Sequence, residues 1–276
     1  MENPLLPQDY SKPVEGMIRQ EKLSDYKKLA LKINADTSDI VHLQHEFGLF
    51  GGNDGEHILT FATLLNKPIV VTFHTVLLTP TEHQKYIIQE LARLSRFSIV
   101  MDEVAKNRLE HVYGLNPNDS VFILHGAPIV NMNKVDAKKI LDHSDSFILL
   151  ANNLLSRSKG IEYAIEAVAE AVKKIPNLKF LIVGETHPLV KKSEGESYRE
   201  ELMALVKKLN LDKSVIFTNE YVPLEKLQIF LAAADVYITP YLDPQQITSG
   251  TLSYAIGAGK ACIATEYVYA KDMLAK

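Results

Sequence analysis

The stretch SFILLANNLLSRSKGIEYAIEAVAEAVKKIPNLKFLIVG, residues 146–184, carries the clearest structural signal in the chain. The apolar runs 146–151 and 179–184 are short and aliphatic, which predicts two buried strands. Between them, residues 160–175 carry an apolar stripe at helical spacing, made by Ile161, Ala164, Ile165, Val168 and Val172. A strand, a helix and a second apolar strand indicate a parallel βαβ unit with both faces of its sheet covered.

The same alternation continues on both sides of this stretch. Further strands are expected at 39–44, 68–73, 97–101, 121–125, 214–219, 235–240 and 261–265. Further helices are expected at 22–34, 55–66, 82–95, 102–113, 196–209, 223–234 and 249–258, and in the stretch that follows the strand at 261–265. An irregular stretch, 126–145, separates the two series, so we expect an α/β chain of two doubly wound, Rossmann-like domains.

Composition narrows the class of protein. The 276 residues suffice for two domains, and a formal net charge of -4 argues against nucleic acid, which requires a basic face. No apolar run approaches the roughly 18 residues of a membrane span, and the N-terminus lacks the pattern of a secretory signal. Cys262 is the single cysteine, which excludes a disulfide framework and a cysteine-based zinc site. A cytoplasmic protein is expected.

Basic, amide, hydroxyl and glycine residues gather after the strands of the second half. Arg157 and Lys159 follow the strand at 146–151, GETHP (184–188) follows the next strand, and QQITSGT (245–251) follows the strand at 235–240. Parallel strands end at one edge of their sheet, where ligands of such sheets bind. This edge is therefore expected to take a phosphorylated ligand.

The segment PQQITSGTLSYAIGAGK (244–260) has two readings. Thr248 or Ser249 can cap a helix whose first free N–H groups hold an anion, with Gly250 permitting close approach. The same residues can instead cap a tightly packed core helix. The segment alone favours the core helix, and the cations expected beside it favour the anion site.

A series of stretches resembles the retaining group 1 glycosyltransferases of family four, which have the GT-B fold. The series runs in the family's order over most of the chain from about residue 39. It comprises LQHEFGLFGG (43–52), VVTFHT (70–75), ILHGAP (123–128), LLSRSKGIEYAIEA (154–167), LIVGETHP (181–188), YVPLEKL (221–227), AAADVYITPY (232–241) and QQITSGTLSYAIGAGK (245–260).

The resemblance implies an activity and a division of the chain. Members transfer a sugar from a nucleotide-sugar donor to a hydroxyl acceptor with retention of the anomeric configuration. Residues 1–130 would form a partial acceptor-side domain and residues 131–276 a donor-binding domain, both Rossmann-like. No cofactor and no metal are expected, because the nucleotide sugar is itself a substrate. The acceptor, a sugar or a lipid-linked molecule, stays open, and so does a peripheral contact with a membrane.

The resemblance also assigns roles to residues. Lys159 would contact the donor diphosphate; the arginine that usually accompanies it would fall at Leu154, and Arg157 is expected to take its place. His74 would face the reacting centre from the first domain. The other implied donor contacts are the turn residues Gly184 and Glu185, the base-lining Tyr221 and Val222, and the phosphate-binding segment Ser249, Gly250 and Thr251.

Two glutamates that the family usually carries are replaced here by Gln246 and Tyr254. Gln246 would hydrogen-bond sugar hydroxyls at the reacting centre, and Tyr254 would reach a ribose hydroxyl. Neither is a carboxylate, which leaves the donor's identity open. The stretches PQQITSGTL and GETHP together resemble one bacterial branch of the family.

Two charged stretches receive weaker interpretations. HLQHE (42–46) is not an H-E-x-x-H motif, so a metal site there is the minor reading, and His45 and Glu46 are expected to shape the acceptor side. KKSEGESYREE (191–201) reads as solvated surface, with an approach to the acceptor as the alternative.

The resemblance leaves a gap at each end of the chain. Complete relatives begin with further βα units, including a glycine-rich loop, and continue with another strand and a helix. Residues 1–276 are therefore expected to be a truncated product, a fragment, or one piece of an enzyme whose partner chain supplies the missing elements.

A glycosyltransferase is the leading reading. The alternatives are a nucleotide-sugar-binding protein without transfer activity and another phosphate-binding enzyme, such as a sugar epimerase; no G-x-G-x-x-G follows a strand, which counts against a dehydrogenase.

Overall fold

The computed structural model describes residue 14 and residues 16–274. The chain divides into two compact units, Met1–Leu124 and His125–Lys276. This boundary lies between Leu124 and His125, whereas the sequence predicted it after residue 130.

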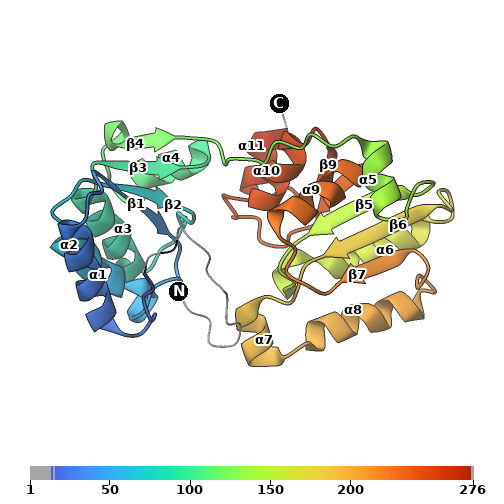
Figure 1. Cartoon of the computed structure of the whole chain (residues 1–276), viewed down its shortest axis with the longest axis horizontal. Coiled ribbons are helices and arrows are strands. Elements are labelled where there is room, and N and C mark those ends of the chain that lie inside the picture. The colour runs from blue at the N-terminus through green and yellow to red at the C-terminus, as the bar shows by residue number, and fades with distance from the viewer. Residues whose placement is uncertain (1–13, 15, 275–276) are drawn as a thin grey trace. The chain divides into compact units, whose positions relative to one another are not determined.

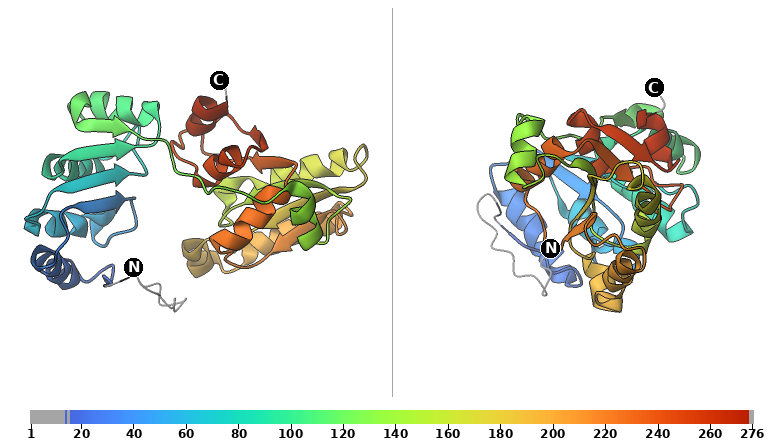
Figure 2. Two further views of the ribbon diagram at one scale, coloured as in Figure 1. Left: turned by 45° about the horizontal axis from the view of Figure 1, so that its top comes forward. Right: turned by 90° about the vertical axis from the view of Figure 1, so that its right-hand side faces the viewer.

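The first unit contains a parallel sheet in the strand order β1-β2-β3-β4, packed with helices (Figure 1). Its strands are β1 (Val41–His45), β2 (Ile69–Phe73), β3 (Phe97–Val100) and β4 (Ser120–Phe122). Its helices are α1 (Leu23–Ala35), α2 (His57–Leu64), α3 (Glu82–Leu94) and α4 (Glu103–His111). The neighbouring strands run side by side in Figure 2, and all their pairings are parallel.

Local signals fix where these helices begin. Thr81 accepts the backbone N–H of Gln84 at 3.1 Å, and Gln84 accepts that of Thr81 at 3.0 Å, which makes a capping box at the start of α3. Asp102 accepts the N–H of Ala105 at 2.6 Å and caps α4. These short-range hydrogen bonds explain why both helix starts were readable from the sequence.

The second unit contains a parallel sheet in the strand order β7-β6-β5-β8-β9 (Figure 1). Its strands are β5 (Phe147–Asn152), β6 (Leu178–Val183), β7 (Val215–Thr218), β8 (Val236–Thr239) and β9 (Ala261–Ala264). Its helices are α5 (Lys134–Ile140), α6 (Ile161–Ala171), α7 (Pro188–Glu194), α8 (Ser197–Lys208), α9 (Leu224–Ala233), α10 (Gly250–Gly257) and α11 (Val268–Leu274).

Strand β5 shows that this sheet is buried on both faces. Leu149 and Ala151 pack into one apolar cluster with residues of α6 and α8, whereas Ile148 and Leu150 pack into another with residues of α9. Successive side chains of a strand point to opposite faces, so an uninterrupted apolar strand needs a helical layer on each side. The expected α/β architecture is confirmed.

The order of the strands reverses at β5. The chain moves outward from β5 to β6 and β7, then returns to place β8 and β9 on the other side of β5. At such a switch point the segments that follow adjacent strands diverge, and a crevice opens beyond their carboxyl ends. The segments after β5, β6 and β8 are those in which the sequence showed basic and polar residues.

Two short helices were not predicted from the sequence. Helix α5 lies inside the stretch expected to be irregular, and α7 begins with Pro188 at its first position. The expectation that 191–201 is solvated surface was wrong in part, because Tyr198 and Arg199 are buried. Arg199 donates to the carbonyl of Gly184 at 3.0 Å, which ties α8 to the turn that follows β6.

Candidate functional site

In the first unit, polar residues collect at the carboxyl ends of β1 and β2. His74 follows β2, and its Nε2 lies 2.7 Å from Oε1 of Gln44. The backbone N–H of His74 donates to the carbonyl of His45 at 2.9 Å, and Thr75 donates its hydroxyl to Glu46 at 2.7 Å. Burial raises the pKa of the Glu46 carboxyl. The residues expected on the acceptor side therefore form one hydrogen-bonded group.

His45 is fully buried among phenylalanine rings. Its ring centroid lies 5.1 Å from that of Phe47 and 5.6 Å from that of Phe73. Neither ring nitrogen has a hydrogen-bond partner in the described part of the chain. Burial, assisted by the nearby His74, lowers the pKa of His45 to about 4, so the ring is neutral at neutral pH. His42 points to the opposite, exposed face of β1, so the two histidines cannot share a metal ion.

We expect His45 to make the folded state sensitive to acid. Between the folded pKa of about 4 and the ordinary value of 6.5, the unfolded chain binds a proton that the folded chain does not. The free energy of unfolding should therefore fall as pH drops through this window, by about 2–3 kcal/mol between pH 7 and pH 4.5. Urea unfolding at pH 7 and at pH 4.5 would measure the loss, and His45→Phe should reduce it.

The exposed His111 offers a matched control for this experiment. His111→Asn removes a histidine without touching the buried ring and should keep the parent's dependence on pH. If His45→Phe and the parent lose the same stability on acidification, the buried ring is not the group that titrates.

In the second unit, a pocket of about 360 Å³ opens at the switch point. The segments that line it follow β5, β6 and β8, and the start of α10 closes it. Its lining residues are His125, Asn153, Leu154, Lys159, His187, Tyr241, Gln246, Thr248, Ser249, Gly250, Thr251 and Tyr254. The structure thus brings Lys159 and the Ser249–Thr251 segment into one cavity.

Lys159 is placed by a short 3₁₀ turn, Arg157–Lys159, that ends at Gly160 with φ +60°. Its ammonium lies 4.0 Å from the centroid of the Tyr241 ring, a cation–π contact. Burial lowers the pKa of Lys159, and the attraction of Asp243 opposes that shift. Of the described residues that line the pocket, Lys159 is the one with a permanent positive charge, and none is a carboxylate. The pocket is therefore suited to an anion.

The start of α10 supplies backbone donors to the same pocket. Ser249 caps the helix by accepting the N–H of Leu252 at 3.3 Å. The first N–H groups of a helix have no intrahelical acceptor, so the amides of Gly250 and Thr251 remain available. Gly250 also packs closely, since a Cβ there would lie 2.9 Å from Nε2 of His125. The body of α10 is buried, as the reading of a core helix expected, and its first turn lines the pocket; anion binding by its amides stays a prediction.

The two residues that replace glutamates line this pocket as well. Gln246 donates its amide to the carbonyl of Thr248 at 2.8 Å, which orients its side chain. Tyr254 makes an edge contact with His125, with 5.8 Å between ring centroids. Both can exchange hydrogen bonds with hydroxyl groups but bring no charge.

A second pocket of about 180 Å³ adjoins the first. It is lined by the remaining predicted donor contacts, Gly184, Glu185, Tyr221 and Val222, together with Asn152 and Leu227. The two pockets share Asn153, Leu154 and Thr251. An elongated ligand can therefore extend from one into the other.

The structure does not bring Arg157 to either pocket. Its guanidinium makes two hydrogen bonds of 2.7 Å to Glu201 and lies over the ring of Tyr198, at 5.2 Å from the centroid. The sequence could not show this, because Glu201 is distant in the chain and comes close only through the packing of α8. The prediction for Arg157 therefore lacks geometric support.

The pocket also contains three side chains that were not predicted from the sequence, Asn153, His125 and His187, although each lies in or beside one of the motifs given above. Asn153 is buried and accepts the hydroxyl of Tyr241 at 2.5 Å, while its Nδ2 has no partner among the described residues. The signal that could have found Asn153 and His187 is their position directly after β5 and β6, where such sheets bind ligands.

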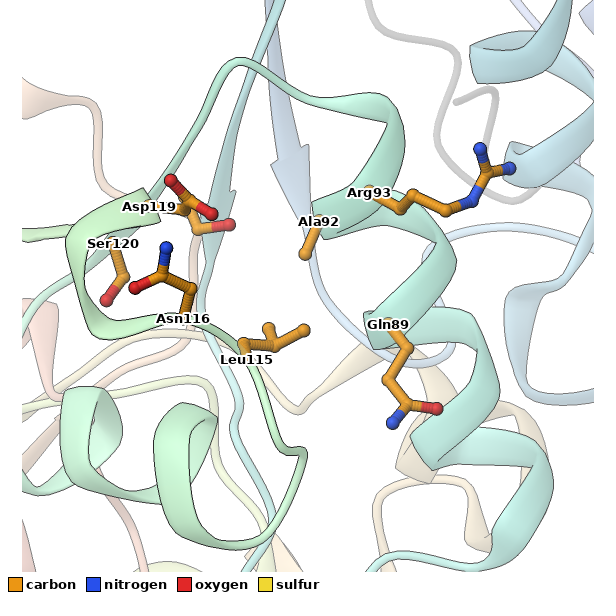
Figure 3. A pocket seen from close by; sticks show the side chains of 8 residues that line it. Gln89, Ala92, Arg93, Leu115, Asn116, Asp119 and Ser120 are labelled. Carbon is orange, nitrogen blue, oxygen red and sulfur yellow. The ribbon is translucent and has the colours of Figure 1, made fainter.

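Figure 3 shows another hollow, in the first unit, between α3 and the loop 115–120. Its volume is about 110 Å³, below the roughly 300 Å³ of typical ligand pockets. Arg93 extends from α3 away from that loop and pairs with Glu90 at 2.7 Å, and Gln89 donates to the carbonyl of Tyr113 at 2.8 Å. This hollow therefore offers less to a ligand than the pockets of the second unit.

Metal-ligating clusters and membrane-spanning helices are both absent from residue 14 and residues 16–274. No group of three or more histidine, cysteine, aspartate or glutamate side chains there could hold a metal ion. No helix in that part combines the length and apolar character needed to cross a bilayer.

The comparisons with known proteins agree with this geometry. Residues 145–276 match the family model for glycosyl transferases group 1. Anabaena Alr3699/HepE, solved in complex with UDP and glucose, matches with a TM-score of 0.70 and 16% identity over 91% of this chain. A glycosyltransferase from Rickettsia africae matches with a TM-score of 0.71 and 17% identity over 95% of this chain and 68% of its own. No curated protein matches the sequence.

A third match is the pneumococcal O-GlcNAc transferase GtfA in complex with UDP and GlcNAc, with a TM-score of 0.63 and 20% identity over 89% of this chain and 45% of its own. This chain spans 65% of the length of HepE. The matches confirm the fold class, a GT-B-like pair of Rossmann-like units. The family model for glycosyl transferases group 1 covers just under half of the chain.

Proposed function

We propose that this chain binds a nucleotide sugar in its second unit and transfers the sugar to a hydroxyl acceptor with retention of the anomeric configuration. The observation that carries the proposal is a cavity with one lysine, the first turn of α10 and no lining carboxylate, which shares three lining residues with a second pocket. The family match over residues 145–276 supports it. The UDP complexes of HepE and GtfA favour UDP as the first nucleotide to test.

The larger pocket would hold the diphosphate and the sugar. Lys159 and the amides of Gly250 and Thr251 would meet the phosphate oxygens, and Gln246 would hydrogen-bond the sugar hydroxyls. In the smaller pocket, Tyr221 and Val222 would line the base. Glu185 would accept hydrogen bonds from the base or the ribose, since a carboxylate is an acceptor only.

In the transfer step, the bond between C1 of the sugar and the diphosphate oxygen breaks. The acceptor oxygen forms its bond to C1 on the same face, and the acceptor proton passes to the departing phosphate. Negative charge grows on the diphosphate, and Lys159 with the α10 amides would stabilise it. His74, from the first unit, is proposed to orient groups at the reacting centre. The nucleotide sugar would be a substrate, and no further cofactor is proposed. A sugar or lipid-linked acceptor, a cytoplasmic location and a partner chain stay predictions.

The proposal predicts that a nucleotide sugar stabilises the chain against heat. Bound ligand at a hundredfold excess over its dissociation constant adds about 2.7 kcal/mol to the free energy of unfolding. We expect a rise in melting temperature with UDP-glucose, and UDP alone should give a large part of it. GDP- and ADP-sugars provide the comparison for the base.

A comparison of Lys159→Ala with Lys173→Ala separates the loss of a contact in the pocket from the removal of one positive charge elsewhere on the chain. Lys173 pairs with Glu170 at the surface, outside both pockets, and its variant should keep the parent's thermal shift. If no nucleoside diphosphate or its sugar raises the melting temperature of the parent, the proposed function fails. Binding without transfer to any acceptor would instead leave a nucleotide-sugar-binding protein.

A further inference from the structure

His187 lines the same pocket as Lys159, but neither the family match nor the roles proposed above use it. It stands directly before α7, and its backbone N–H donates to the carbonyl of Leu155 at 2.9 Å. Thr186 beside it forms an isolated parallel bridge with Leu155. The segment that follows β5 thus holds the backbone of Thr186 and His187 in place through Leu155.

The imidazole of His187 has a defined tautomer. Its Nδ1 accepts the backbone N–H of Leu189 at 3.2 Å, which caps α7. A ring nitrogen that accepts a hydrogen bond carries no proton, so the proton of the neutral ring lies on Nε2. In the described part of the chain, Nε2 has no hydrogen-bond partner. Burial and the positive charge of Lys159 both lower the pKa of His187, which keeps the ring neutral.

We propose that His187 is a neutral hydrogen-bond donor to the bound diphosphate, with its Nε2–H aimed by the capping bond between Nδ1 and Leu189. This inference rests on the proposed function, because it names a further contact in the same pocket. Lys159 would supply charge, and His187 a directed N–H group without a second charge. A protonated ring would lose the capping bond, since both of its nitrogens would then be donors.

Two substitutions separate capping from ligand contact. His187→Asn keeps an acceptor near the position of Nδ1, so α7 stays capped, but it shortens the side chain and removes the Nε2 donor. His187→Gln places an amide N–H near the position of Nε2 and gives up the cap. The probe is UDP, titrated by calorimetry, and urea unfolding checks that each variant is folded.

We expect His187→Asn to weaken UDP binding roughly tenfold, because one hydrogen bond to a charged group is lost. The free energy of unfolding should change little. His187→Gln should bind UDP within about threefold of the parent, even if it is less stable. In the parent, the proton-bearing Nε2 of His187 should shift in the ¹⁵N–¹H spectrum when UDP is added, while Nδ1 stays unprotonated.

The outcomes separate a failure of the proposed function from a failure of the role of His187. If the parent binds no nucleoside diphosphate, the proposed function and this inference fall together. If the parent binds UDP and His187→Asn binds it equally well, only the role of His187 is overturned. If His187→Gln is as weak as His187→Asn, an N–H group near the position of Nε2 does not restore UDP binding, and the inference is wrong.

Discussion

Lys159→Ala is expected to lower the rate of sugar transfer by on the order of 10²–10³-fold, the usual cost of removing one group that stabilises charge in the transition state. Among the described residues that line the pocket, no other has a permanent positive charge. The half-buried ammonium is partly desolvated, so its attraction for a developing phosphate charge is stronger than it would be in water.

Transfer rate and UDP affinity measured on the same preparation would test this expectation. Lys159→Arg keeps the charge but changes its shape, and it should retain more activity than Lys159→Ala. Lys173→Ala controls for the change in net charge. Transfer by Lys159→Ala within threefold of the parent would reject the role of Lys159, provided that the parent itself is active.

Gly160→Ala is expected to lower the free energy of unfolding by about 3–5 kcal/mol, the range of severe backbone and packing conflicts. Gly160 has φ +60°, which disfavours any side chain. A Cβ there would also lie 2.2 Å from the carbonyl oxygen of Pro240. The segment after β8 cannot easily move away, because Leu242 donates its N–H to the carbonyl of Ser158 at 2.9 Å.

Gly259→Ala is the matched control for this substitution. Gly259 has a similar φ of +67°, but a Cβ there meets nothing within 4 Å. It should cost only the backbone strain, about 1–2 kcal/mol. Urea unfolding of the two variants measures the difference, and equal losses would show that the contact with Pro240 costs nothing. Gly160 follows Lys159 in the chain, and Pro240 precedes Tyr241. A shift of either segment should displace the Lys159 ammonium from the Tyr241 ring, so Gly160→Ala should also weaken UDP binding.

Most of the secondary structure could be predicted from the sequence. The expected strands and the expected helices of three or more turns are present, because apolar periodicity reports directly which residues are buried. The short helices α5 and α7 were missed, since a seven-residue helix carries too few residues to show a period. Their starting signals, Asn133 as a cap and Pro188 at the first position, were present but are common in loops as well.

The candidate site was predictable in outline. The rule that ligands bind beyond the carboxyl ends of parallel strands pointed to the segments after β5, β6 and β8, and those segments line the two pockets. The choice among individual side chains was not predictable to the same degree. Arg157 and Lys159 are neighbours in one short turn, yet one pairs with Glu201 on α8 and the other enters the pocket.

The sequence by itself therefore determined the α/β alternation, the division into two units and the edge of the sheet at which polar residues gather. These follow from local periodicity and from the shared direction of parallel strands. Only the tertiary structure decided which cation faces the pocket, which nitrogen of His187 is free, and that no carboxylate lines the cavity beside Lys159. Each depends on partners brought close by the strand order β7-β6-β5-β8-β9, which the spacing of residues along the chain does not reveal.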